Sequence, residues 1–163
     1  MRMLVYLNFD GVLHPNHLLY RYGRAPELLS PGHTVLEYAS AFAEALEVCP
    51  DATVVLNTWW TYHLPMDACV ELLPIPIRRR VSGTTLACAF HGEVLPNRVR
   101  EAEKHIGMPA TEELLVVDNS AARYRSDLLP HLLLVDEERG LACQSAMRAL
   151  KRRLSFLRIQ KGA

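Results

Sequence analysis

Residues 4–15 have the sequence LVYLNFDGVLHP, an apolar run that stops abruptly at polar residues and a glycine. The first four residues include β-branched and aromatic members, which is typical of a strand covered on both faces of a sheet. Gly11 follows the polar residues, and a glycine lets the backbone turn and approach a ligand closely. Open α/β sheets bind ligands at the carboxyl ends of their strands, so we expect a functional site just after Leu7.

Length, charge balance and cysteine spacing limit the kinds of protein that this chain can be. The chain has 163 residues, the size of one domain with a single core. Because 18 Lys+Arg balance 18 Asp+Glu, we expect no membrane binding, no strong nucleic-acid patch and only local phosphate recognition. The first apolar run is too short for a signal peptide or a membrane span, which predicts a cytoplasmic protein. The four cysteines form no Cys-x-x-Cys pair and are interpreted as free thiols.

Apolar runs and helical periodicity predict alternating strands and helices along the rest of the chain. We expect strands at 53–56, at Val81, at 114–117 and at 132–136, and helices at 30–48, 65–73, 98–106 and 141–157. Asn97 is predicted to cap the third helix and Gly107 to end it, while residues 82–85 are predicted to form a turn. This order favours right-handed crossovers and a parallel sheet of about five strands with helices on both faces.

Polar side chains follow three of the predicted strands at their carboxyl ends. Asn8 and Asp10 follow the first strand, Thr58 the second, and Asp118 and Asn119 the fourth. In a parallel sheet these ends lie on one edge, where oxygen ligands for Mg²⁺ and groups for phosphoryl transfer can meet.

The first motif resembles that of the haloacid dehalogenase (HAD) superfamily of phosphohydrolases, a hydrophobic strand followed by Asp-x-Asp-Gly-(Thr/Val). Asn8 departs from it, because it stands where the family has its nucleophilic aspartate. The resemblance covers nearly the whole chain and is closest to a small group that includes domains linked to RNA repair. It implies a Rossmannoid three-layer sandwich with no separate cap domain, spanning residues 1–163, with 16–31 as a flap or loop over the site.

The resemblance also implies a role for each motif residue. Asn8 stands at the nucleophile position, Asp10 at the general acid/base, and Thr58 at the hydroxyl that binds the phosphoryl group. Arg98 is the candidate for the third-motif cation, with Lys104 as the second choice. The implied Mg²⁺ ligands are Asn8, Asp10, Asp118 and Asn119, and the implied substrate-binding residues are Gly11, Asn57, Thr58 and Arg98.

Three aromatic or imidazole side chains near these motifs receive other interpretations. His14 is interpreted as a local structural donor, and Trp59 as a core residue. Trp60 stands where relatives often carry an arginine, which would remove a donor to the phosphate.

Asn8 leaves the function open between two main interpretations. The first is a Mg²⁺-dependent phosphomonoesterase, acting through an aspartyl-phosphate, that is inactive here through an engineered substitution or natural loss, because an amide is a poor nucleophile. The second is a natural pseudoenzyme that binds a phosphorylated ligand or a protein partner without turnover. A residual enzyme that uses water directly and an interaction protein that uses its outer helices are further alternatives. The expected ligand is a phosphorylated small molecule or a nucleic-acid end; the sequence predicts no particular oligomeric state.

Overall fold

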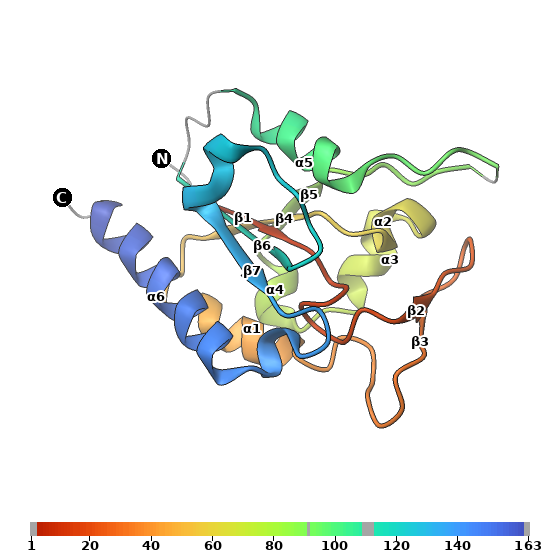
Figure 1. The fold of residues 1–163 in the computed structure, drawn as a ribbon, viewed down its shortest axis with the longest axis horizontal. Helices are drawn as coiled ribbons and strands as arrows, with labels where there is room; N and C mark the ends of the chain where they lie inside the picture. The colour runs from red at the N-terminus through yellow and green to blue at the C-terminus, as the bar shows by residue number, and fades with distance from the viewer. Residues whose placement is uncertain (1–2, 91, 109–112, 162–163) are drawn as a thin grey trace.

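A central sheet organises the computed structural model, which describes residues 3–90, 92–108 and 113–161. Within them, parallel strands are arranged in the order β5-β4-β1-β6-β7 (Figure 1). The strands are β1 (Leu4–Leu7), β4 (Thr53–Leu56), β5 (Val81–Thr84), β6 (Leu114–Asn119) and β7 (Leu132–Val135). The predicted α/β Rossmannoid fold is confirmed, and β1 is the central strand.

Helices cover both faces of the sheet. On one face lie α1 (Ala39–Leu46), α4 (Ile75–Arg78) and α6 (Gln144–Lys161), and on the other lie α5 (Arg98–Ile106) and the 3-10 helix Ser126–His131 (Figure 1). Two short helices, α2 (Trp60–His63) and α3 (Met66–Glu71), follow β4. A further 3-10 turn, Gly140–Ala142, precedes α6.

Alternation along β1 explains why both faces are covered. Val5 and Leu7 pack into the larger core with α1 and α6, whereas Tyr6 packs into the smaller core beneath the 3-10 helix Ser126–His131. All three side chains are at most 1% exposed. Burial on both faces is what an uninterrupted apolar strand indicates, because successive side chains point to opposite faces.

The register of the sheet aligns the first polar residue after each central strand. Leu7 pairs with Leu56 on one side and with Val117 on the other. The backbone bonds continue one residue further, from Asn8 N to Val117 O at 3.1 Å and from Asn57 N to Leu7 O at 2.8 Å. Asn8, Asn57 and Asp118 therefore form one row across the carboxyl edge, which we call the edge row.

Several predicted elements have different bounds in the structure. The predictions for 53–56 and 98–106 are confirmed, including the Asn97 cap, whose side chain accepts from Arg100 N. The helix predicted from Ser30 begins only at Ala39, because Leu36 has φ of 56° and breaks the helical path. Residues 82–84 of the predicted turn belong to β5, and the last helix begins at Gln144, after the 3-10 turn. The helices α2 and α4 were not predicted.

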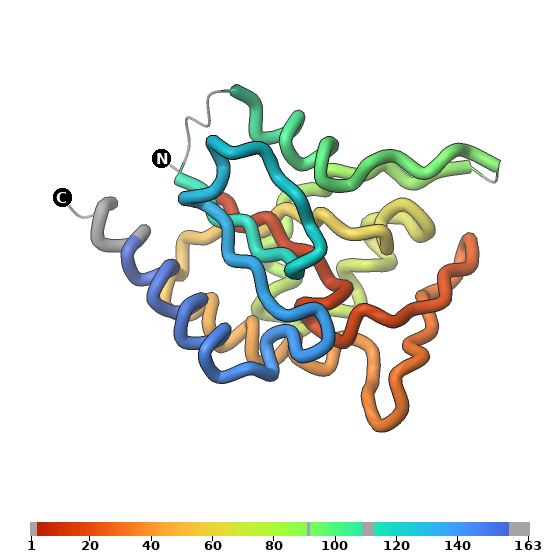
Figure 2. Tube along the Cα trace, viewed as in Figure 1, coloured from red at the N-terminus to blue at the C-terminus, as the bar shows by residue number. Residues whose placement is uncertain are grey.

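Two excursions from the sheet lie beside α2 (Figure 2). Residues 16–31 contain the antiparallel strands β2 (Leu18–Leu19) and β3 (Glu27–Leu28), and Gly23 N donates to His63 O at 3.0 Å. The chain between β5 and α5 runs out and back as an arm, which is fastened to Tyr62 by Ala89 N and by Val94 O. No helix among the described residues combines the length and the apolar character needed to cross a bilayer.

Candidate functional site

Asp118 is the hub of the edge row. Its carboxylate is fully buried at the end of β6. Oδ1 accepts from Asn8 Nδ2 at 2.9 Å, Arg98 Nη2 at 3.0 Å and Asn119 N at 2.8 Å, and Oδ2 accepts from Arg98 Nη1 and Tyr124 Oη, both at 2.7 Å. Burial, followed by the charge of Asp118, raises the pKa of Tyr124, so the phenol remains a donor. These hydrogen bonds use nearly all of the acceptor capacity of the Asp118 carboxylate.

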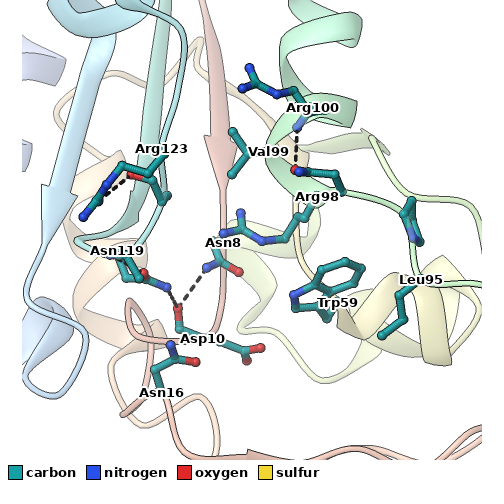
Figure 3. Close-up of a pocket in the computed structure, with 14 residues that line it drawn as sticks. Asn8, Asp10, Asn16, Trp59, Leu95, Arg98, Val99, Arg100, Asn119 and Arg123 are labelled. Carbon is teal, nitrogen blue, oxygen red and sulfur yellow. Dashed lines mark hydrogen bonds between the residues drawn. The ribbon is translucent and has the colours of Figure 1, made fainter.

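Asn8 acts as a donor toward the site. Its Nδ2 donates to the backbone oxygen of Asp10 (Figure 3) at 2.9 Å and to Asp118 Oδ1, which that figure does not draw, also at 2.9 Å. Its Oδ1 is buried and has no hydrogen-bond partner among the described residues. An unsatisfied buried acceptor is costly, so Oδ1 is the atom of this site with the strongest need for a donor from a ligand.

Arg98 forms a buried bidentate ion pair with Asp118. It is 8% exposed and opens α5, so the Asn97 cap fixes the place from which its side chain extends. Asn57 orients it, since Arg98 Nη1 donates to Asn57 Oδ1 at 2.6 Å and Asn57 Nδ2 donates to Arg98 O at 3.0 Å. Burial alone lowers the pKa of the guanidinium, but the charge of Asp118 and the hydrogen bonds to it outweigh burial and raise that pKa.

The carboxylate of Asp10 points away from Asn8, although its backbone oxygen faces the edge row (Figure 3). Trp60 Nε1 lies 2.8 Å and His14 Nε2 3.0 Å from Oδ1, and the Tyr20 hydroxyl donates to Oδ2. His14 Nδ1 accepts from Leu36 N at 3.0 Å, so the imidazole proton must be on Nε2, which donates to Asp10.

Tyr20 connects the 16–31 segment to this carboxylate. Its ring stacks on His63 with centroids 4.8 Å apart, and its hydroxyl reaches Asp10. Burial and the charge of Asp10 raise the pKa of Tyr20, which keeps the phenol protonated. Whether the segment acts as a flap stays a prediction.

Gly11 allows Asn119 to approach the first loop. Its φ is 73°, and a Cβ at this position would lie 2.8 Å from the Cβ of Asn119. Asn119 Nδ2 consequently reaches the backbone oxygen of Asp10 at 2.9 Å. The contribution of Gly11 seen here is therefore close packing against Asn119.

An open cavity of about 710 Å³ lies against these residues. Asn8, Asp10, Arg98 and Asn119 form its floor, and Trp59, Leu95 and Pro96 form an apolar wall. Arg100 and Arg123, both exposed, also line it. Arg98 is paired with Asp118 and Arg100 with Glu103, so Arg123 is the lining arginine without an ion pair among the described residues, and its charge favours an anionic ligand.

The structure brings together most of the residues predicted for the site. Asn57 lies behind Arg98 rather than in the cavity, and Lys104 is exposed on the last turn of α5, so Arg98 is the cation at the edge row. Thr58 is one residue beyond the edge row; its Oγ1 accepts from Trp60 N at 3.3 Å, and it does not belong to the described cavity lining. The functional roles of all these residues stay predictions.

The interpretation of Trp59 as a core residue is wrong, and three donors to the buried carboxylates were not predicted. Trp60 is fully buried, and its indole donates to Asp10, whereas Trp59 is half-buried and lines the cavity. Tyr20 and Tyr124 are the other missed donors. Each is a tyrosine or tryptophan in a segment adjoining a motif, which is a weak signal in a single sequence.

The arrangement does not fit the Mg²⁺ that the resemblance implies. Mg²⁺ requires oxygen ligands, generally with one or two carboxylates free to coordinate it. Here the Asn8 amide nitrogen lies against both Asp118 Oδ1 and the Asp10 backbone oxygen, and Arg98 already neutralises Asp118. Among the described residues, no cluster of three His, Cys, Asp or Glu side chains is placed to hold a metal.

A comparison with protein families identifies the lineage. Residues 4–146 match the model of the HAD domain in Swiss Army Knife RNA repair proteins. The chain belongs to this HAD family. The matched range includes every strand of the sheet and every residue of the edge row. No curated protein and no solved structure gave a significant match.

Proposed function

We propose that this HAD domain binds the phosphorylated end of a ribonucleotide ligand and does not hydrolyse it. The observation that carries the proposal is the Asn8 amide, which stands at the nucleophile position and donates its protons to Asp118 and to the backbone of Asp10. An aspartyl-phosphate requires a carboxylate oxygen as nucleophile, whereas an amide carries no charge and attacks poorly.

The cavity supports recognition of a phosphate. Arg100 and Arg123 are exposed at its rim, where guanidinium groups can form bidentate hydrogen bonds with phosphate oxygens. Asn97, Arg98 and Val99 at the beginning of α5 also line it, and the first N–H groups of a helix favour an anion. Since Arg98 is paired with Asp118 and Arg100 with Glu103, Arg123, which has no ion pair among the described residues, supplies the unbalanced positive charge.

Two features favour a ribonucleotide over a simple phosphate ester. Trp59 offers a half-buried aromatic wall on which a base can stack. The unsatisfied Oδ1 of Asn8 needs a donor, which a ribose hydroxyl has and an ionised phosphate lacks. The family's occurrence in RNA repair proteins supports an RNA end as the source of both groups.

Binding can be measured by titrating the tryptophan fluorescence with short ribo-oligonucleotides that carry a 5′-phosphate, a 3′-phosphate or neither. We expect one phosphorylated end to bind at least about tenfold more tightly than the hydroxyl end, which corresponds to about 1.4 kcal/mol. Arg123→Ala should remove most of this difference, while Arg152→Ala, an exposed arginine on α6, should preserve it. Equal affinity for all three oligonucleotides would refute the proposal, as would release of phosphate by the unaltered chain.

A second candidate is a phosphohydrolase whose only defect is Asn8, because Asp10 still stands at the acid/base position of the motif. In that case Asn8→Asp should hydrolyse an aryl phosphate in the presence of Mg²⁺, and Asp10→Asn in the same background should abolish the hydrolysis. If Asn8→Asp remains inactive over a broad panel of phosphate esters, the binding function alone stands.

A further inference from the structure

We infer that the side-chain amide of Asn8 takes the place of a metal ion, so that this site is assembled without a divalent cation. The inference concerns how the site is held together, and it stands whether or not the ligand is a phosphorylated RNA end. It starts from the disagreement between the donor set and the Mg²⁺ expected from the family.

The position of the amide nitrogen is the first argument. Asn8 Nδ2 lies 2.9 Å from each of two oxygens that come from different strand ends, the Asp10 backbone oxygen and Asp118 Oδ1. A bridging cation performs the same task of holding two electron-rich oxygens together. Here the two N–H groups of one amide hold them.

The opposite orientation of the amide requires a cation. If Oδ1 replaced Nδ2, three oxygens would face one another with no proton between them, which is unfavourable unless a positive ion lies among them. The nitrogen-inward orientation satisfies both acceptors without an ion, and it leaves Oδ1 as the unpartnered atom.

Asn119 reinforces this substitution. Its Nδ2 donates to the same Asp10 backbone oxygen at 2.9 Å, so two amides share one carbonyl. The charges of the edge row also close without an ion, because the single negative charge of Asp118 is matched by Arg98. The Asp10 carboxylate lies outside the edge row and is held by the Trp60, His14 and Tyr20 donors. A carboxylate at position 8 or 119 would add a negative charge beside Asp118, which a cation would have to balance.

The first experiment uses the unaltered chain. Thermal unfolding is followed with millimolar Mg²⁺ and with EDTA, and Mn²⁺ binding is measured by electron paramagnetic resonance. We expect the melting temperature to be the same in both solutions, and we expect no Mn²⁺ to bind at submillimolar concentration. A Mg²⁺-dependent rise in melting temperature, or Mn²⁺ binding that Asp118→Asn abolishes, overturns the inference.

The second experiment converts the amide into a carboxylate. Asn8→Asp should lower the melting temperature in EDTA by about 5–10 °C, because two hydrogen bonds become a repulsive contact, and Mg²⁺ should restore much of this loss. Gln144→Glu makes the same amide-to-carboxylate change at an exposed position and should respond to neither solution. An Asn8→Asp protein as stable in EDTA as in Mg²⁺ would contradict the inference. If this variant does not fold, the measurements on the unaltered chain decide.

The same measurements separate this inference from the proposed function. Phosphorylated oligonucleotides that bind only in the presence of Mg²⁺ would uphold the proposed function and overturn the amide substitution. A melting temperature independent of Mg²⁺, together with no binding of any oligonucleotide, would uphold the amide substitution and overturn the proposed function.

Discussion

Removing the Arg98 guanidinium tests whether the edge row is held by a buried ion pair. Arg98→Met keeps much of the side-chain volume but leaves the Asp118 carboxylate buried with its amide, backbone and phenol donors only. Both partners are almost inaccessible, at 8% and 0% exposure, so solvent cannot compensate for the lost charge. Breaking such a pair costs about 3–5 kcal/mol. Arg98→Met also removes two hydrogen bonds to Asn57, and we expect a total loss in the free energy of unfolding of about 4 kcal/mol.

The assay is a double-mutant cycle with urea unfolding. Arg98→Met alone should lower the free energy of unfolding by about 4 kcal/mol, whereas in an Asp118→Asn background the same change should cost at most about 1 kcal/mol, because it then removes a buried charge that has already lost its partner. The coupling energy should therefore exceed about 2 kcal/mol. If the two changes are additive within about 0.5 kcal/mol, the ion pair does not stabilise the site and the reasoning is wrong.

Two other positions give further predictions. Gly11→Ala should destabilise the chain by about 2–3 kcal/mol in urea unfolding, because its Cβ would meet Asn119 at 2.8 Å. Gly23 has the same φ of 73° but open space around it, so Gly23→Ala should cost only about 1 kcal/mol. Equal losses of stability in the two variants would contradict the close packing of Gly11 against Asn119. Tyr20 has a pKa raised above its ordinary value of 10.0 by burial and by Asp10, so the folded state holds its proton more tightly than the unfolded state does. Stability should therefore fall as the pH rises above about 10, and Tyr20→Phe should make this fall shallower; an unchanged slope in pH-dependent unfolding would argue against the Tyr20–Asp10 contact.

The location of the site was predictable because it depends on local sequence and on the geometry of parallel strands. Each central strand is an apolar run that ends at a polar residue, and strands paired in register bring those residues to one edge. Strand register explains why Thr58 lies one residue beyond the edge row. Asn57 rather than Thr58 is in register with Asn8, so the Asn57 side chain contacts Arg98. The Thr58 hydroxyl instead accepts a hydrogen bond from the backbone N–H of Trp60.

The remaining errors concern contacts between distant segments. Tyr20 reaches Asp10 from an excursion whose path depends on the hairpin of β2 and β3, and Leu36 adopts a positive φ although its sequence continues a helical period. The Leu36 N–H instead bonds to His14, and this contact is formed only in the folded chain. Periodicity reports which face of an element is apolar, but it does not report such tertiary hydrogen bonds.

In the edge row, the bonds that hold the strands together do not involve the side chains that form the candidate site. The strand ends are joined by main-chain bonds, from Asn8 N to Val117 O and from Asn57 N to Leu7 O, which do not depend on the side chains at those positions. Side chains in the row can therefore be exchanged while the sheet retains its register. An insertion of one residue would turn each following side chain to the opposite face. Within such a scaffold, a substitution in the edge row alters the chemistry and leaves the sheet intact, whereas an insertion within a strand disturbs both.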